Sequence, residues 1–177
     1  MKTVMHEGSY RCKVVSWGAR AGKNGSQSLG VSMQCQIFEA WNHATKSWDD
    51  WRGYEPTGIY VDTYPIGSDG EVNETGVDQL VKSIAWTGDM LMFDTPPPDD
   101  LVVVVDAREE TYTDDKGPHL TVRGRWLNPG DHTPGSGGRG IARKMDRESL
   151  EKANAALGAK LRAAAGAAAV KAIETPF

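Results

Sequence analysis

The sequence lacks the features that place a chain in a membrane or in an oxidising compartment. Its 177 residues contain no apolar run near the ~20 residues that a membrane-spanning helix needs. Residues 1–8 contain no apolar signal core, so we expect a cytoplasmic protein that makes no membrane contact. The two cysteines, Cys12 and Cys35, each lie in an alternating strand pattern, which favours buried free thiols over a disulfide.

The common signatures of catalysis are also missing. The four histidines are scattered without metal-ligand spacing, and no CxxC pair or nucleophile elbow occurs. The stretch GARAGKNG resembles a phosphate-binding loop in composition only, because Asn24 follows Lys23 where that motif needs Ser or Thr. We expect no enzyme, no cofactor and no metal site. A hydrolase that uses loop carboxylates such as Asp49 and Asp50 is a weaker alternative.

Charge is distributed unevenly along the chain. The formal net charge is −4, with −7 on residues 1–129 and +3 on residues 130–177. An acidic body argues against nonspecific binding of duplex DNA through overall charge, but it permits a local basic groove.

Hydrophobic periodicity predicts five strands and one helix in the first 129 residues. Apolar residues alternate in three early segments and in two later ones, whereas residues 77–86 have helical spacing. The five predicted strands are residues 10–17, 31–37, 59–66, 101–112 and 119–127. Gly124, inside the last of them, indicates a bulge or bend.

This β-β-β-α-β-β order predicts a mainly β fold, a five-stranded OB-type Greek-key barrel. Another small barrel or a sandwich also fits the spacing. We expect three regions: the barrel in residues 1–129, a flexible Gly/Pro linker in 130–145, and an alanine-rich C-terminal helix with its tail in 146–177. This helix is expected to dock on its own barrel or on a second copy, which makes a homo-oligomer a prediction.

In an OB barrel, two loops and the face of strands 2 and 3 form the binding cleft. Here the loops are residues 18–30 and 113–118. The first is rich in glycine, which lets backbone N–H groups approach a ligand, and it contains Arg20 and Lys23. Such a cationic groove suits phosphates.

Single-stranded nucleic acid also needs aromatic faces for its bases. Tyr60 and Tyr64 share a strand face with Asp62 and lie opposite Ile59 and Val61, so we expect the tyrosines to point into the cleft. The remaining candidates are one aromatic platform and four phosphate contacts: Trp17, and Arg11, Lys13, Arg123 and Arg125. The tryptophans of residues 41–54 would extend the cleft. Trp17 and the tyrosines also have a purely structural interpretation, as rings that pack under the loops or the terminal helix, and Arg123 and Arg125 have one as partners of nearby carboxylates.

The segment GSYRCKVVSWGARAGKNGSQSLGVSMQCQIF resembles the opening of phage-encoded OB-type single-stranded DNA-binding proteins. The similarity resumes at VDQLVKSIAWTG and at DDLVVVVDAREETYTDDKGPHLTVRGRWLNP, and it covers residues 8–129. The tryptophan-rich insertion at 41–54 departs from that family, as does the alanine-rich C-terminus. The resemblance implies largely sequence-independent binding in phage replication, recombination or repair, with proteins of these pathways as partners.

The sequence therefore predicts a non-enzymatic protein that binds single-stranded DNA. The main alternative is a protein-interaction module, such as a phage inhibitor or assembly adaptor, that uses the tryptophan-rich loop and the acidic surface.

Overall fold

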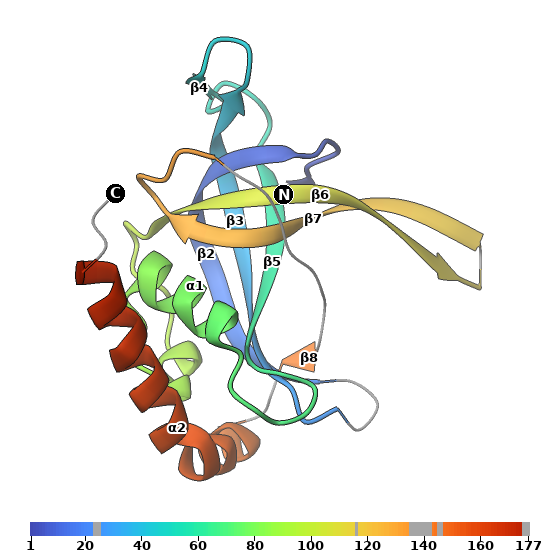
Figure 1. Cartoon of the computed structure of the whole chain (residues 1–177). Helices are drawn as coiled ribbons and strands as arrows, with labels where there is room; N and C mark the ends of the chain where they lie inside the picture. Colours follow the sequence, from blue (N-terminus) through green and yellow to red (C-terminus); the bar gives the residue numbers. More distant parts are fainter. Residues whose placement is uncertain (23–25, 116, 135–142, 145–146, 175–177) are drawn as a thin grey trace.

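The computed structural model describes residues 1–22, 26–115, 117–134, 143–144 and 147–174. The chain is mainly β with a C-terminal helix, as predicted, and its strands form one mixed sheet (Figure 1). The strands are β1 Lys2–Thr3, β2 Gly8–Ala21, β3 Leu29–Asn42, β4 Ser47–Asp50, β5 Thr57–Ile66, β6 Val102–Asp114, β7 Gly117–Pro129 and β8 Arg143–Lys144. The helices are α1 Glu74–Ile84, the short 3-10 helix η1 Met90–Asp94 and α2 Arg147–Glu174.

Five of these strands form a ring of pairings. The order is β2–β3–β5–β7–β6, and β6 returns to pair with β2. All contacts in the ring are antiparallel except that between β5 and β7, where Val61 lies beside Gly124. The inner side is filled by alternate residues of each strand, including Ile59 and Val61, which are almost fully buried. The predicted inward face of residues 59–66 is therefore confirmed.

A β-bulge in β2 reverses which residues point inward. Val14 lies opposite Cys35 and Ser16 lies opposite Gln34, so Val15 is an extra residue without a partner. Side chains of a strand alternate between its two faces. One extra residue therefore makes every later residue of the strand point to the face opposite to the one that strict alternation predicts. Strict alternation along residues 10–17 predicts that Trp17 shares the outward face of Arg11 and Lys13, and this prediction is wrong because of the bulge.

A second bulge lies beside Gly124, as the sequence predicted. Asp106 lies opposite Trp126 and Ala107 lies opposite Gly124, which leaves Arg125 as the extra residue of β7.

Helix α1 and the η1 region cover part of the ring and complete the core. Asn73 caps α1 by accepting a hydrogen bond from the backbone N–H of Gly76 (3.3 Å). The apolar stripe of α1 and the first residues after it join the inward-facing strand residues in one cluster. Its members from this region are Val77, Leu80, Ile84, Trp86, Met90 and Phe93.

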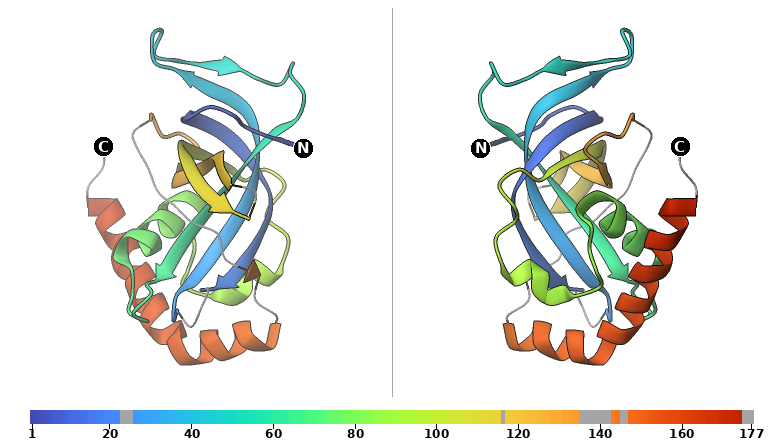
Figure 2. Two further views of the ribbon diagram at one scale, coloured as in Figure 1. Left: turned by 90° about the vertical axis from the view of Figure 1, so that its right-hand side faces the viewer. Right: turned by 90° about the vertical axis from the view of Figure 1, so that its left-hand side faces the viewer.

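Helix α2 packs against α1 and η1 and belongs to the same hydrophobic cluster (Figure 2). Leu161, Ala165 and Ala168 are buried there. The backbone of α2 comes so close to Gly88 that a Cβ at this position would lie 2.5 Å from the Cα of Arg162. This close contact favours docking of the helix on its own body, and the division at residues 129 and 146 stays a prediction.

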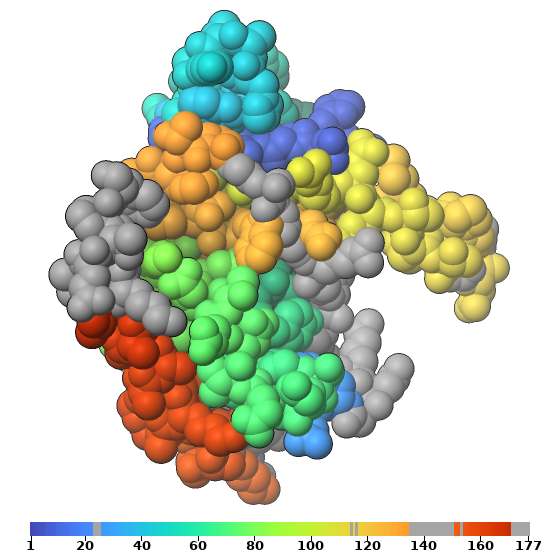
Figure 3. Space-filling model, viewed as in Figure 1, coloured from blue at the N-terminus to red at the C-terminus, as the bar shows by residue number. Residues whose placement is uncertain are grey.

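Two two-stranded ribbons extend beyond the ring. The ends of β3 and β4 form one of them (Figure 2). The distal halves of β6 and β7 pair only with each other and project as an arm from the body (Figure 3). No helix in the described part of the chain is both long and apolar enough to cross a membrane.

Candidate functional site

A pocket of about 350 Å³ opens on the outer face of the ring, where β2, β3, β5 and β7 come together. Three of the predicted binding residues, Arg20, Tyr60 and Arg123, line it. The full lining is Thr3, Arg20, Ser32, Tyr60, Thr121, Val122 and Arg123. We call this the Arg20 pocket.

Arg20 is held in place by a hydrogen-bonded group at the back of the pocket. Its Nη1 donates to Oδ1 of Asp62 (3.0 Å) and to Oγ of Ser32 (3.1 Å). Only 2% of the Asp62 side chain is exposed, against 18% of the Arg20 side chain. Burial raises the pKa of Asp62, whereas the hydrogen bond from Ser32 and the positive charges of Arg20 and Arg123 lower it; the net direction is upward.

The two tyrosines of β5 differ in what they present to solvent. Tyr60 is 46% exposed and lines the pocket. Tyr64 is half-buried because its ring lies over Gly30, where a Cβ would come within 2.7 Å of the ring. Burial and the charge of Asp62 raise the pKa of the Tyr64 phenol. Tyr60 is therefore the better placed of the two to stack with a base.

The two arginines of β7 also differ. Arg123 lines the pocket, and its charge acts on Asp62. Arg125 is the bulged residue; it does not line the pocket, and its Nε is buried with no hydrogen-bond partner in the described structure.

Arg11 and Lys13 lie elsewhere on β2. Arg11 forms an ion pair with Glu39, donates through Nε to the carbonyl of Gly130 (2.9 Å) and lies 4.3 Å from the ring centroid of Trp48. Lys13 pairs with Asp99 at 3.4 Å. Arg11 is nine residues from Arg20 along the strand, about 30 Å at the usual rise. The structure thus does not bring these two cations to the Arg20 pocket.

Trp17 is a core residue and not a surface platform. It is 8% exposed, its indole N–H donates to the carbonyl of Thr95 (2.6 Å), and its ring packs edge-on against Phe93. The bulge at Val15 is the physical reason, because it turns Trp17 to the inner face.

The glycine-rich connection is shorter than predicted. Strand β2 continues to Ala21 and β3 begins at Leu29, so Arg20 belongs to a strand and not to the loop. The backbone N–H of Gly22 bonds the carbonyl of Ser28 (2.8 Å) at the base of this connection. Lys23 lies outside the described residues. In the other predicted loop, the described residues 113–115 and 117–118 lie at the tip of the β6–β7 arm.

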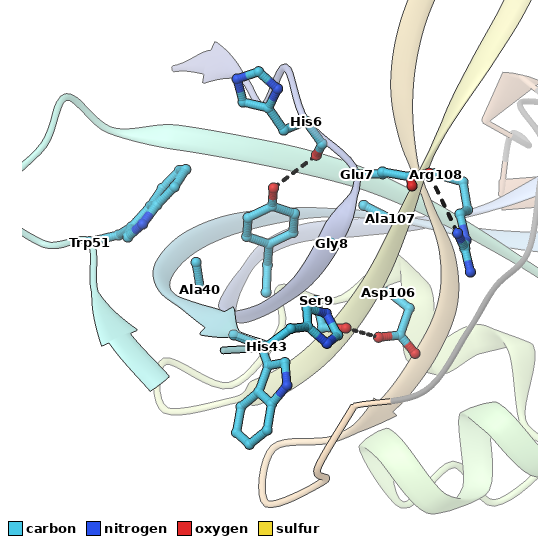
Figure 4. A pocket seen from close by; sticks show the side chains of 12 residues that line it. His6, Glu7, Gly8, Ser9, Ala40, His43, Trp51, Asp106, Ala107 and Arg108 are labelled. Atoms are coloured by element: carbon cyan, nitrogen blue, oxygen red, sulfur yellow. Dashed lines mark hydrogen bonds and ion pairs between the residues drawn. The ribbon is translucent and has the colours of Figure 1, made fainter. Parts of the chain in front are cut away.

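A second pocket, of about 470 Å³, lies between the start of β2, the end of β3 and β6 (Figure 4). At its edge Ser9 donates a hydrogen bond to Asp106, which also accepts one from Asn128 (3.1 Å). Burial raises the pKa of Asp106, whereas these hydrogen bonds and the charges of His132 and Arg108 lower it; again the net direction is upward. We call this the Asp106 pocket.

The tryptophan-rich segment is an ordered ribbon next to the Asp106 pocket. Trp41 and Trp48 lie opposite each other on β3 and β4, with ring centroids 5.2 Å apart. Trp51 packs against Tyr10 and Tyr54. These aromatic residues contact one another and do not line the Arg20 pocket.

The residue that sequence reasoning missed is Asp62. The alternation of β5 placed it between Tyr60 and Tyr64, but it was given no role. Its position between the two tyrosines puts an acidic side chain on the face of a predicted cationic cleft. A buried charge of this kind needs a partner, and this was the signal in the sequence.

The described residues contain no group of three or more histidine, cysteine, aspartate or glutamate side chains placed to hold a metal ion. No protein-family model matches the chain, and a search of curated proteins finds no match. The functional interpretation therefore depends on the geometry of the pocket and on the strand arrangement around it.

Proposed function

We propose that the chain binds single-stranded DNA on the face that contains the Arg20 pocket, and that the five-stranded ring is an OB-type barrel. The observation that carries the proposal is the meeting of Arg20, Arg123 and the exposed ring of Tyr60 in one pocket. Cationic groups that take phosphates, next to an aromatic face that takes a base, are what single-strand binding needs.

The strand order supports the OB assignment. The ring runs β2–β3–β5–β7–β6, and α1 lies in the sequence between its third and fourth strands. An OB Greek key has this arrangement. In that fold, oligonucleotides bind to the face of the second and third strands, to the loop between strands 1 and 2, and to the loop between strands 4 and 5. The Arg20 pocket lies on the corresponding strands, β3 and β5.

Two backbone pairings adjoin the strands that line the pocket. Strand β8, which is Arg143–Lys144, pairs with Arg20 and Ala21 by backbone register. On the ring face, Gln34 lies opposite Tyr60 and is available for polar contacts beside it. The β6–β7 arm, to which the Arg123 strand belongs, extends the same region outward.

The resemblance to phage single-stranded DNA-binding proteins supports the same proposal, and it adds replication, recombination or repair as the setting. The alternative, a protein-interaction module, predicts no effect of pocket variants on oligonucleotides because its contact surface is the tryptophan-rich ribbon.

The test is fluorescence anisotropy of labelled oligo-dT, with a matched duplex as competitor, across a salt series. Tyr60→Ala should weaken oligo-dT binding by about 1–3 kcal/mol, since a stacked base contributes that much, whereas Tyr60→Phe should bind like the wild type. Arg123→Ala should reduce the salt slope by about 0.7, the value for one phosphate contact on a single strand.

Matched controls lie away from the pocket. Tyr54 is more exposed than Tyr60, at 69%, and the Arg52 side chain is 63% exposed. Tyr54→Ala and Arg52→Ala should leave binding unchanged. A wild-type chain that does not bind oligo-dT at about 50 mM salt, where phosphate contacts are strongest, would rule out the proposal.

A further inference from the structure

The Arg20 pocket has a cationic surface and an acidic back wall. Its lining includes two guanidinium groups and no carboxylate, yet Asp62 lies directly behind Arg20 and Ser32. This carboxylate is almost fully buried and accepts a hydrogen bond from the same guanidinium that faces the pocket. A phosphate that enters the pocket therefore meets an arginine that already has a negative partner.

We infer that Asp62 is a built-in counter-ion that holds Arg20 ready in the free protein and limits the affinity of the pocket for phosphate. The inference rests on the proposed function, because it concerns the regulation of the same site. One buried acid would then set the affinity for phosphate. Neither the shape of the pocket nor the net charge of the chain determines that affinity.

The hydrogen bonds of Arg20 show how the residue serves both partners. Nη1 makes both of its bonds, one to Asp62 and one to Ser32, while Nε and Nη2 make none to a described residue. A guanidinium has five N–H donors in a fixed fork, so the remaining donors can bind a phosphate without breaking the Asp62 contact. Asp62 thus positions the fork while its charge opposes the phosphate.

The polar groups around Asp62 come from four strands, and the charged or titratable ones come from three of them. They are Arg20 on β2, Tyr64 on β5 and Arg123 on β7, with the neutral Ser32 on β3. At neutral pH the two arginines and one carboxylate leave the pocket with a net charge of +1. Neutralising Asp62 doubles that charge with no new side chain. The upward shift of its pKa agrees with a carboxylate whose charge is costly at this position.

The experiment compares two buried aspartates. Asp62→Asn keeps the shape and an oxygen that accepts from Arg20, but removes the charge. Asp106→Asn removes the same charge from a buried site in the other pocket, so both variants change the net charge equally. Binding of labelled oligo-dT is measured by anisotropy from about 50 to about 300 mM salt, after the unfolding midpoint of each variant.

We expect Asp62→Asn to bind oligo-dT about 3- to 10-fold more tightly at low salt, with a steeper salt slope, and Asp106→Asn to bind like the wild type. Adding Arg20→Ala to Asp62→Asn should abolish the gain, since Asp62 acts through that arginine. Should the amide prevent folding, Asp62→Ser is the second variant, because it keeps a hydroxyl that accepts from Nη1.

The wild-type pH dependence is an independent measurement. As the pH falls through the raised pKa of Asp62, its carboxyl takes up a proton, so oligo-dT binding should tighten, and Asp106→Asn should show the same trend. In Asp62→Asn, binding of oligo-dT should tighten less than in the wild type as the pH falls, because this side chain no longer takes up a proton.

The outcomes separate this inference from the proposed function. A wild type that binds oligo-dT, together with equal affinity in Asp62→Asn, overturns the inference and leaves the function standing. Equal tightening in Asp62→Asn and Asp106→Asn also overturns it, because the effect is then general charge. If no variant binds oligo-dT, both proposals fail.

Discussion

The Arg20 pocket and the Asp106 pocket each contain a buried aspartate, and the two residues are held differently. Asp62 accepts a hydrogen bond directly from the Arg20 guanidinium, whereas Asp106 accepts its hydrogen bonds from the neutral Ser9 and Asn128 and is affected by Arg108 and His132 only through their charge. Burial raises the pKa of both carboxyls. What differs is the partner: in the first pocket the acid is half of an ion pair whose other half, Arg20, lines the pocket.

This difference shows how one sheet produces two kinds of site. When neutral groups donate to a buried carboxylate, they satisfy its hydrogen-bonding capacity, and the bonds link neighbouring strands. A buried carboxylate bound by arginine also fixes the position of a cation at the surface, where an anion can reach it. Partner choice, more than burial or pocket size, therefore separates the candidate interface from the second pocket.

The largest effect on folding is expected from Arg20→Ala. It leaves Asp62 buried without its hydrogen-bonded cation, and breaking such a pair costs about 3–5 kcal/mol in unfolding free energy, measured by urea denaturation. Arg123→Ala is the control, since it leaves the hydrogen bonds of Asp62 in place. If both variants lose the same small amount, the Arg20–Asp62 pair has no special role in stability.

A smaller loss is expected from Ser9→Ala in the other pocket. Asp106 loses one donor but keeps Asn128, so the cost should be about 1–2 kcal/mol in the same urea assay. Ser16→Ala is the control, because Ser16 is exposed and its bond to Gln34 is long, at 3.4 Å. A loss in Ser9→Ala as large as that in Arg20→Ala would contradict the distinction between the two pockets.

The smallest effect is expected from pH. Both aspartates have a folded-state pKa above the usual value, so the folded chain binds these protons more tightly than the unfolded chain does. This contribution to stability is present at low pH and is lost as the pH rises through the folded-state pKa. Wild-type protein should therefore gain stability relative to Asp62→Asn and Asp106→Asn as the pH falls from neutral, measured by thermal unfolding. A gap that stays constant with pH would show that neither carboxyl titrates differently on folding.

Local periodicity was sufficient for the main elements. Strict alternation in residues 59–66 identified Ile59 and Val61 as core and Tyr60 as outward, because successive strand side chains point to opposite faces. Helical spacing in residues 77–86 predicted a helix there for the same kind of reason, and the structure has α1 at Glu74–Ile84. The mainly β class with a C-terminal helix followed from these patterns.

The candidate site was predicted only in part. Arg20, Tyr60 and Arg123 line one pocket, but Trp17 lies in the core, and Arg11 and Lys13 lie outside the pocket. A bulge shifts the inward and outward alternation of a strand by one residue, and composition gives no clear sign of it. Alternation counted from Tyr10 therefore predicts the wrong face for the residues beyond Val15. The end of β2 and the start of β3 were predicted as part of a loop, because small residues such as glycine and alanine give little periodic signal.

The sequence by itself determined the five strands of the ring, the helices α1 and α2, and the apolar side of β5, since these depend on neighbours two to four residues apart. Only the tertiary structure decided which cations share a pocket and which acid lies behind them. Arg20, Asp62 and Arg123 come from three strands that are distant in the chain, and ring closure brings them together. Burial of Asp62 and its ion pair with Arg20 exist only after that closure, because desolvation and contact are properties of packed strands and not of any one segment.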